Sequence, residues 1–351
     1  MKRLLSAVLV LSIALLCLAG CTSPAGPANG SSGSSITPSE NPSATKKEPL
    51  RVAVQSMYCS YPVGLILAED MAKDYGLELE ISVFSSGATI NEAMGDWDIA
   101  VTGGAFVYAL ANYDCKLIAH QIDGTACNDF VCRPGTKYDA AKNDSKALAE
   151  AIKGSRVLCN VGTTGHYAFM LWLEALGLTS TDVNFMSMDF ATVYSSWTAG
   201  EGDLCVMVAP YANYDHGGVI LNSLKGIGGN LYESTVCTAD AYENRYDDVV
   251  SFVEMLYKAC DKLAADEDLA FKTAKAWYVD HGKEMGDDAV LAEYKAKPVF
   301  TSEYAKSLDL TRFATSYAKY FVSQGLIEED KLDTVTANCA NDILKDAMKA
   351  F

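Results

Sequence analysis

A short turn of glycine, threonine and histidine residues separates an apolar run from an apolar helical pattern in the middle of the chain. Residues 162–166 read Gly-Thr-Thr-Gly-His, after the run Val157–Val161 and before a helical pattern that ends near Gly177. The first N–H groups of a helix have no partner inside it, and the helix dipole adds partial positive charge there. Glycine allows close approach of the backbone, and threonine adds a hydroxyl group. This combination suits the binding of a small polar group.

Turns of the same kind follow other strand-like runs in both halves of the chain. They are found at 85–87, 102–104 and 209–211, and Asp189 stands where it can cap the helix that follows. Ligands of open parallel sheets bind beyond the carboxyl ends of the strands, where these turns lie. Capping of the next helix is the simpler explanation for any single turn. Because the turns recur in two halves, we expect two sets of them to face one another across a cleft and hold a small solute.

Other polar and aromatic side chains near these turns extend the candidate site. Asp129 and Asp189 can pair with an amine. His166 is expected to be a ligand donor or a helix cap, because no motif pairs it with a serine or cysteine nucleophile. Five tyrosines form either an aromatic box for a flat ring or a cation, or part of the core: Tyr58, Tyr61, Tyr167, Tyr194 and Tyr211.

The residues predicted to contact the solute come from the loop after the first strand and from the turns just described. They are Gln55, Ser56, Met57, Tyr58, Ser86, Gly87, Thr102, Gly103, Gly104, Asp129, Thr163, Thr164, Gly165, His166, Asp189, Pro210 and Tyr211.

Strand-like and helical patterns alternate from residue 50 to about residue 220, and such alternation predicts an α/β fold with parallel sheets. The predicted strands are Leu50–Val54, Leu77–Phe84, Trp97–Val101, Leu117–Ile122, Val157–Val161, Val183–Met188 and Asp203–Val208. The predicted helices between them are Val63–Tyr75, Ala88–Met94, one that ends at Tyr113, one that ends near Gly177 and one that runs from Asp189 through Ala199. From about residue 245 onward the pattern is almost wholly helical.

The repeated strand–helix pattern predicts two lobes joined by two crossings of the chain. Residues 50–121 form the first part of lobe one, residues 122–220 form lobe two, and residues 221–351 return to lobe one and end in helices.

The N-terminal segment has the composition of a secretion signal. Lys2 and Arg3 precede the apolar stretch Leu4–Leu18, which is too short to span a membrane comfortably, so residues 1–20 are expected to be removed. The signal ends in Leu-Ala-Gly and is followed by Cys21, a pattern that resembles a bacterial lipobox. That resemblance implies lipidation of the Cys21 thiol, with a plain signal peptide as the alternative. We therefore expect an extracytoplasmic protein that is anchored to the bacterial cell membrane.

Residues 21–49 are rich in Ser, Gly, Pro, Ala and Asn and predict a flexible tether after the lipidated cysteine. The later sequence has no run of some twenty uninterrupted apolar residues, so no further membrane span is expected.

The chain is acidic, with a formal net charge of -17, which argues against a nucleic-acid partner. Most of its eleven cysteines lie in apolar strings and are expected to be small buried hydrophobes. Cys127 and Cys132 are a candidate disulfide pair. The sequence has no CxxC pair and its four histidines are scattered, so neither a metal site nor a cofactor is predicted.

Five stretches of the chain are typical of one family: "LRVAVQ" at 50–55, a segment at 68–104 that ends in "GDWDIAVTGG", "IKGSRVLCNVGTTGHY" with the helix after it, "AGEGDLCVMVAPY" at 199–211, and "TVCTADAYENRYDDVVSFVEMLYKA" from 235. Through them, residues 50–255 resemble the substrate-binding proteins of bacterial ABC importers of the sulfonate, nitrate, taurine and thiamine-precursor type. The resemblance lies in the order and spacing of these stretches. It implies a two-lobe periplasmic-binding-protein-like fold of type II, with two parallel-rich sheets flanked by helices and a ligand cleft between the lobes.

The same resemblance implies a binding protein, rather than an enzyme, that delivers a small solute to an ABC transporter permease and acts as a monomer. The chain departs from the family pattern in its first loop, residues 55–59, which is bulky and aromatic. No Arg or Lys stands in a cleft turn, so a sulfonate, a nitrate-like anion, a pyrimidine and an amine all remain open as the solute. An extracytoplasmic enzyme or a sensor domain on the same fold is the alternative, although no GxSxG, HExxH or P-loop lysine is present.

Overall fold

The first of two five-stranded sheets is built from both ends of the described chain. A computed structural model describes residues 47–351, which form one compact unit. The strand order of this sheet is β2-β1-β3-β10-β4. Its strands are β1 (Leu50–Gln55), β2 (Leu79–Phe84), β3 (Ile99–Thr102), β4 (Lys116–Asp123) and β10 (Tyr232–Cys237).

The second sheet is built from the middle of the chain. Its order is β7-β6-β8-β5-β9. Its strands are β5 (Asn128–Cys132), β6 (Arg156–Cys159), β7 (Asn184–Ser187), β8 (Leu204–Val208) and β9 (Val219–Ser223). We use the terms first lobe and second lobe for each sheet together with the helices packed on it.

Each sheet contains one strand that runs against the other four. β1 pairs in parallel with β2 and β3, whereas β10 is antiparallel to both β3 and β4. In the second sheet β6 pairs in parallel with β7 and β8, whereas β5 is antiparallel to β8 and β9. The reversed strands β5 and β10 are the first strands after the chain passes from one sheet to the other. The prediction of two parallel-rich sheets flanked by helices is confirmed.

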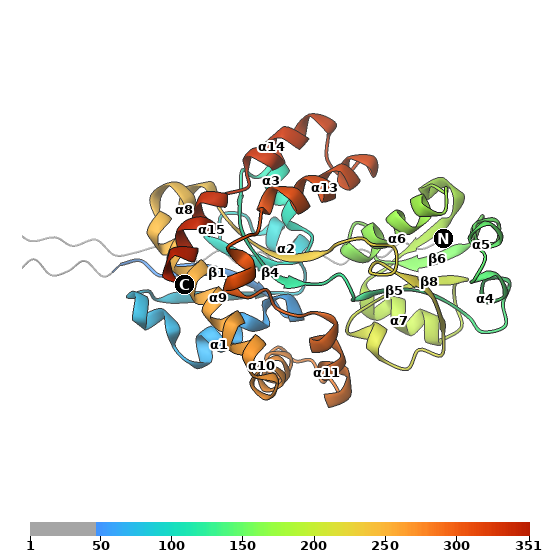
Figure 1. The fold of residues 1–351 in the computed structure, drawn as a ribbon, viewed down its shortest axis with the longest axis horizontal. Helices are drawn as coiled ribbons and strands as arrows, with labels where there is room; N and C mark the ends of the chain where they lie inside the picture. The colour runs from blue at the N-terminus through green and yellow to red at the C-terminus, as the bar shows by residue number, and fades with distance from the viewer. Residues whose placement is uncertain (1–46) are drawn as a thin grey trace, which may run out of the picture. The chain divides into compact units, whose positions relative to one another are not determined.

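The helices are α1 (Tyr61–Ala68), α2 (Gly87–Glu92), α3 (Phe106–Asn112), α4 (Lys137–Ala141), α5 (Ser145–Ile152), α6 (Thr164–Ala175), α7 (Phe190–Thr198), α8 (Ala239–Asn244), α9 (Tyr246–Ala265), α10 (Glu267–Asp280), α11 (Asp287–Ala296), α12 (Ser302–Ala305), α13 (Leu310–Ser323), α14 (Leu332–Ala337) and α15 (Asn341–Ala347). Helices α1, α9 and α10 pack together on one side of the first sheet, and α3, α13 and α14 on the other (Figure 1).

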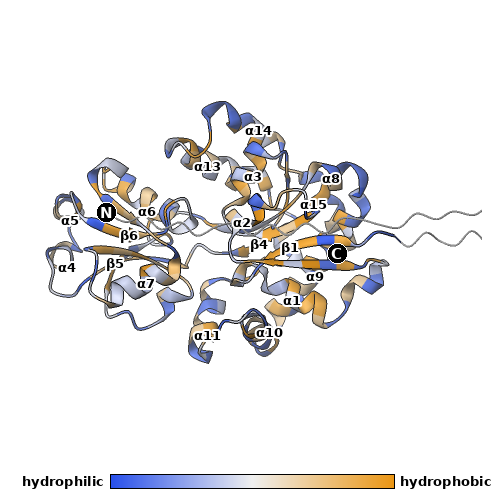
Figure 2. Ribbon diagram, turned by 180° about the vertical axis from the view of Figure 1, so that it is seen from behind, coloured by the Kyte–Doolittle hydropathy of each residue, from blue (hydrophilic) through white to orange (hydrophobic). Residues whose placement is uncertain are grey.

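The central strands carry apolar side chains on both faces because helices cover both faces of each sheet (Figure 2). In β1, Val52, Ala53 and Val54 are all fully buried although neighbouring side chains point to opposite faces. Successive side chains of β8 point to opposite faces of the sheet and contact different helices. Val206 and Val208 lie against α6, whereas Cys205 and Met207 pack with Trp197 of α7. The sheet therefore supplies the core of each lobe and fixes where its following helices begin.

The helix predicted at Val63–Tyr75 is divided in the structure. α1 ends at Ala68, and a 3-10 helix follows at Met71–Tyr75. Between them Asp70 adopts a left-handed conformation with φ of 53°, which interrupts the α-helical hydrogen bonding. The apolar periodicity continues through this break, so the sequence pattern alone does not reveal it.

Strands β5, β9 and β10 were missing from the sequence prediction. β5 and β10 each follow a crossing, and β9 lies at the edge of its sheet with Ile220 exposed. Neither turn chemistry nor simple alternation marks them clearly, because their partners lie far away in the sequence.

The nine cysteines of residues 47–351 are free thiols, so the candidate pair Cys127 and Cys132 forms no disulfide in this structure. Among those residues, none of the helices is long and apolar enough to cross a membrane. The predicted signal, the lipidation site at Cys21 and most of the predicted tether lie outside the described residues.

Candidate functional site

The side chain of Gln55 gathers the turns of the first lobe at one point. Gln55 is the last residue of β1 and is buried. With its amide oxygen turned toward them, Gln55 accepts hydrogen bonds from the backbone N–H groups of Gly87 at 3.2 Å and Gly103 at 3.1 Å, and from the Thr102 hydroxyl at 2.6 Å. The end of β1 and the turns after β2 and β3 therefore meet at this side chain, which occupies the position expected for a solute oxygen.

Other predicted residues of the first lobe hold the loops in place. Ser86 caps α2 by accepting a hydrogen bond from the Thr89 backbone N–H at 3.3 Å. The backbone N–H of Ser56 donates to the Phe84 carbonyl, and the Met57 carbonyl accepts from the indole N–H of Trp277 at 3.1 Å. These contacts connect the first loop to β2 and α10.

The turn at the start of α6 uses its two threonines differently. The Thr163 hydroxyl donates to the Asn160 carbonyl at 2.6 Å and holds the turn together. No side chain caps α6, and the Thr164 hydroxyl has no hydrogen-bond partner within the described part of the chain. At Gly165 an added Cβ would lie 2.7 Å from Val208, so glycine is needed for close packing of α6 on β8.

Thr164 meets the first lobe directly. A Cβ added to Gly104 would lie 2.7 Å from the Thr164 methyl group and 2.3 Å from the Tyr317 hydroxyl. Gly104 belongs to the turn after β3, whereas Thr164 begins α6 and Tyr317 lies on α13. The two sets of turns thus face one another, and we call this contact region the seam.

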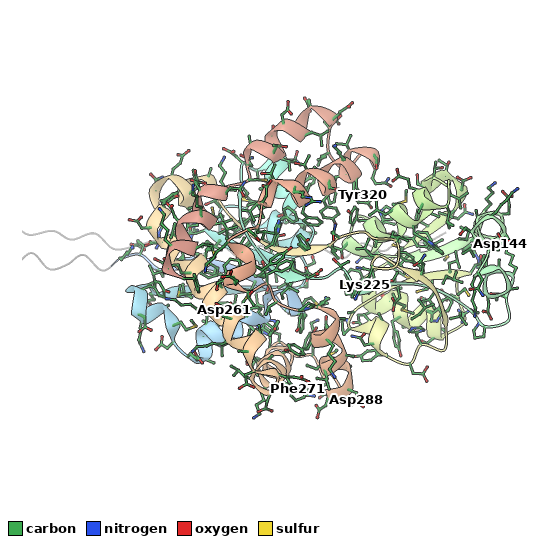
Figure 3. All side chains as sticks on the ribbon, viewed as in Figure 1. Asp144, Lys225, Asp261, Phe271, Asp288 and Tyr320 are labelled. Atoms are coloured by element: carbon green, nitrogen blue, oxygen red, sulfur yellow. The ribbon has the colours of Figure 1, made fainter. Side chains whose placement is uncertain are left out.

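A hydrogen bond between His166 and Tyr320 also crosses between the lobes. The Tyr320 side chain lies where the first lobe faces the second (Figure 3). Its hydroxyl is 2.6 Å from His166 Nδ1, which also accepts from the Gly162 backbone N–H at 3.3 Å. His166 Nε2 is buried without a partner among the described residues. Burial lowers the pKa of His166 to about 4. The imidazole is therefore neutral at physiological pH and accepts rather than donates at Nδ1.

The five candidate tyrosines belong to three separate groups rather than one box. Tyr58 and Tyr61 are fully buried, with ring centroids 4.3 Å apart. Tyr167 of α6 contacts Tyr317 at 4.4 Å and Tyr320 of α13 at 4.8 Å, and so adds an aromatic contact beside the seam.

The third aromatic group lies in the second lobe, after β8. Pro210 precedes the short 3-10 turn Tyr211–Asn213, and the Tyr211 ring stacks on Tyr194 at 5.6 Å. Both rings contact Tyr214. Burial raises the pKa of the Tyr211 hydroxyl.

The two predicted aspartates of the second lobe have different surroundings. Asp189 caps α7, accepting from the Thr192 backbone N–H at 3.0 Å and from its hydroxyl at 2.6 Å. These bonds lower the pKa of Asp189. Asp129 on β5 is half-buried and makes no side-chain hydrogen bond or ion pair among residues 47–351, and burial raises its pKa to about 6. Of these two aspartates, Asp129 is therefore the one whose carboxyl group is free to bind a hydrogen-bond donor or a cation.

A buried charge cluster beside the first-lobe turns was not anticipated. Lys297 Nζ lies 3.0 Å from Glu293 Oε1 and 3.7 Å from Glu233 Oε1, and Glu293 also accepts from the Tyr278 hydroxyl at 2.5 Å. Burial acts to lower the pKa of Lys297, whereas the nearby Glu293, Cys127 and Glu233 act to raise it. The second effect is larger, so the pKa of Lys297 lies above its ordinary value.

Both ends of this cluster are positioned by Ile122 of β4. Glu233 of β10 pairs with Ile122 in the sheet, and Val299, two residues after Lys297, forms an isolated bridge with the same residue. The charges therefore sit where the chain leaves and re-enters the first sheet. Lys297 lies in a helical region far from every turn motif in the sequence, and no local signal marks it.

A cavity of about 570 Å³ adjoins the aromatic contacts beside the seam. Helix α6 contributes Tyr167 and Leu171, and the segment 228–230 lies along the second crossing. The C-terminal part contributes the largest share of the lining: Tyr304, Ser307, Leu308, Asp309, Arg312, Phe313 and Ser316. The C-terminal helices therefore shape the space between the lobes, a role that the sequence did not suggest. The described residues contain no cluster of three or more metal-ligating side chains.

The arrangement of two five-stranded sheets, each with one reversed strand and with turns that meet at a seam, is that of the periplasmic binding proteins. The structure resembles the nitrate-binding protein NrtA of Synechocystis PCC 6803, with a TM-score of 0.66, 12% identity, and coverage of 86% of this chain and 89% of that one. It also resembles the aliphatic sulphonate binding protein SsuA of Escherichia coli, with a TM-score of 0.65, 17% identity, and coverage of 82% and 91%.

The chain belongs to the NMT1-like family, which it matches over residues 43–277. It is also 28% identical over 350 residues to a putative ABC transporter periplasmic binding protein of Brachyspira hyodysenteriae, and the match covers 97% of both chains. The family resemblance inferred from the sequence is confirmed.

The pH dependence of stability tests the buried, neutral state of His166. Its pKa falls from an ordinary value of about 6.5 to about 4 on folding. The unfolded chain therefore binds a proton first, and stability is lost as the pH falls from about 6.5 toward 4. We expect His166→Gln to reduce this loss by up to about 1.4 kcal/mol per pH unit, measured by urea unfolding at a series of pH values.

Tyr320→Phe provides the control for this experiment. It removes the hydroxyl beside His166 but keeps the imidazole buried, so the pH slope should stay as in the wild type. Burial also lowers the pKa of His120 to about 3. The contribution of His120 to the pH dependence of stability is the same in the wild type and in both variants. Equal slopes for the wild type and His166→Gln would contradict the assignment.

Proposed function

We propose that this protein captures a small solute between its two lobes outside the cytoplasm and delivers it to an ABC importer. The observation that carries the proposal is the seam, where turns from the carboxyl ends of strands in both sheets converge on Gly104 and Thr164. Ligands of open α/β sheets bind at such strand ends. A relative that matches nearly the full length of the chain is named as a periplasmic binding protein of an ABC transporter, and this supports the same function.

Closure of the lobes around the solute is the proposed mode of capture. Contacts that come from both lobes form together only in the closed state, so a solute that makes them shifts the protein toward closure. The His166–Tyr320 hydrogen bond joins the lobes in this structure and adds to the closed state. We place the lobe boundaries in the two connections between the sheets, after Asp123 and after Ser223, and the protein is proposed to act as a monomer.

The N-terminal signal adds a proposed location. Cleavage before Cys21 and lipidation of its thiol would anchor the protein to the bacterial cell membrane, with residues 21–49 as a tether to the folded part. A tether of this kind keeps the solute-binding part close to a permease in the same membrane.

Mass spectrometry under non-denaturing conditions tests the binding function. Full-length protein is purified gently from its source and measured before and after denaturation. We expect a defined mass of a small solute that is present only in the folded sample, because the buried seam retains its ligand. Protein that carries no solute, and that also gains none from extracts of its growth medium, would contradict the proposal.

Two matched threonine substitutions separate binding from folding at the seam. Thr164→Val removes a hydroxyl without a partner, so affinity for the recovered solute should fall roughly 3- to 10-fold while stability hardly changes. Thr163→Val removes the bond to the Asn160 carbonyl and should lower the free energy of unfolding by about 1 kcal/mol. Calorimetric titration and thermal melts measure both effects. A destabilised Thr164→Val protein with unchanged affinity would assign this hydroxyl to the fold.

The lipid anchor is tested with Cys21→Ala. Wild-type protein expressed in a bacterium should partition into the detergent phase of a Triton X-114 separation, because its acyl chains enter the micelle. The substituted protein should remain in the aqueous phase or retain its signal. Wild-type protein in the aqueous phase would show that the cysteine carries no lipid.

A further inference from the structure

The helix starts of the first lobe offer little to an anion, because Gln55 already uses them. Its side-chain oxygen accepts from the N–H groups of Gly87 and Gly103 and from the Thr102 hydroxyl. Helix N-termini bind anions through such donors. An anionic solute would have to displace a buried side chain that satisfies these donors.

A carboxylate lies beside the same turn. A Cβ added to Gly103 would be 2.7 Å from Glu233 Oε2, and one added to Gly124 would be 3.3 Å from Glu233 Oε1. The side-chain partner of Glu233 among residues 47–351 is Lys297, at 3.7 Å, and Lys297 is closer to Glu293. Two carboxylates therefore share one ammonium group, and the cluster carries one uncompensated negative charge when both are ionised. Burial raises the pKa of Glu233, so its ionised form needs a cationic partner beyond Lys297.

Two further polar atoms at the seam are buried without partners. The Tyr317 hydroxyl, fully buried, points at the position of a Gly104 Cβ, 2.3 Å away. On the second lobe the Oδ1 atom of Asn128, also fully buried, lies 3.7 Å from the position of a Gly165 Cβ. Both atoms can accept hydrogen bonds. Buried polar atoms without a partner are rare in folded proteins, and the Asn128 oxygen can be satisfied only by a hydrogen-bond donor.

We propose that the solute presents a protonated amine at the seam, where Glu233 pairs with its charge and Tyr317 and Asn128 accept its N–H groups. This inference rests on the proposed solute-binding function and names the class of solute. An ammonium group has three donors and compensates the excess charge of the cluster. A sulfonate or nitrate at the same position would add a second negative charge beside Glu233 and leave the Asn128 oxygen unpaired. The solute's remaining polar groups are free to contact the turn at Thr164.

The test uses two probes that share an apolar tail and differ in the charge of the head group. Thermal melts of the wild-type protein, stripped of bound solute, are measured with n-butylammonium chloride and with sodium 1-butanesulfonate at equal ionic strength. We expect butylammonium to raise the melting temperature. Glu233→Gln should lose this response, which corresponds to at least a tenfold weaker affinity.

Two more variants keep the result interpretable. Glu243→Gln on the exposed part of α8 removes the same charge away from the seam and should respond like the wild type. Glu233→Asp keeps the charge but withdraws it by one methylene, so it should retain a weakened response, and it carries the test if Glu233→Gln does not fold.

Three results would overturn the inference: no shift with butylammonium, a shift with butanesulfonate alone, or an undiminished butylammonium response in Glu233→Gln. The chemical identity of the solute recovered from the native protein shows whether the amine inference alone has failed or the proposed solute-binding function as well. A bound solute without a basic nitrogen refutes the amine and leaves solute binding intact, whereas absence of any bound solute refutes both.

Discussion

The N–H groups at the starts of the first-lobe helices need hydrogen-bond partners, and the Gln55 side chain supplies one for two turns at once. This single interaction draws the ends of β1 and β3 and the start of α2 together. It also explains the glycine at position 87, since an added Cβ there would lie 2.5 Å from Ala105 and 2.7 Å from the Thr102 hydroxyl. The donors of these two first-lobe turns are therefore satisfied within the lobe, whereas α6 of the second lobe begins without a side-chain cap.

The asymmetry between the lobes bears on the chemistry of the seam. Charged groups inside a protein are costly unless they are paired, and a buried ion pair adds little to stability compared with apolar packing. Stability alone therefore does not explain the cluster of Glu233, Glu293 and Lys297, and this supports the proposed amine site. Strand pairing with Ile122 places the cluster next to both crossings between the sheets.

The C-terminal helices connect the fold to the site. Helix α13 packs on α3 and β4 of the first lobe and places Tyr317 and Tyr320 against α6 of the second. These aromatic contacts and the hydrogen bond to His166 close one side of the space between the lobes. The same helix contributes Arg312 and Phe313 to the neighbouring cavity, so one element serves both the seam and the space beside it.

The sequence by itself determined the α/β class, most strands, and the turns that follow them, because strand and helix periodicities and turn residues are local signals. It did not distinguish capping from binding: Ser86 and Asp189 cap their helices, whereas Thr164 has a free hydroxyl, and all three are small polar residues at helix starts. Only the tertiary structure decided which of these groups already have partners.

The tertiary structure alone also brought Lys297 to Glu233 and Tyr320 to His166. The partners in these pairs are 64 and 154 residues apart in the sequence, and their contact depends on where the chain crosses between two sheets. Strand pairing with Ile122 fixes the first pair, and the packing of α13 on the first lobe fixes the second. Long-range pairing of this kind leaves no periodic trace in the residues involved, which is why the turns could be predicted and the charges beside them could not.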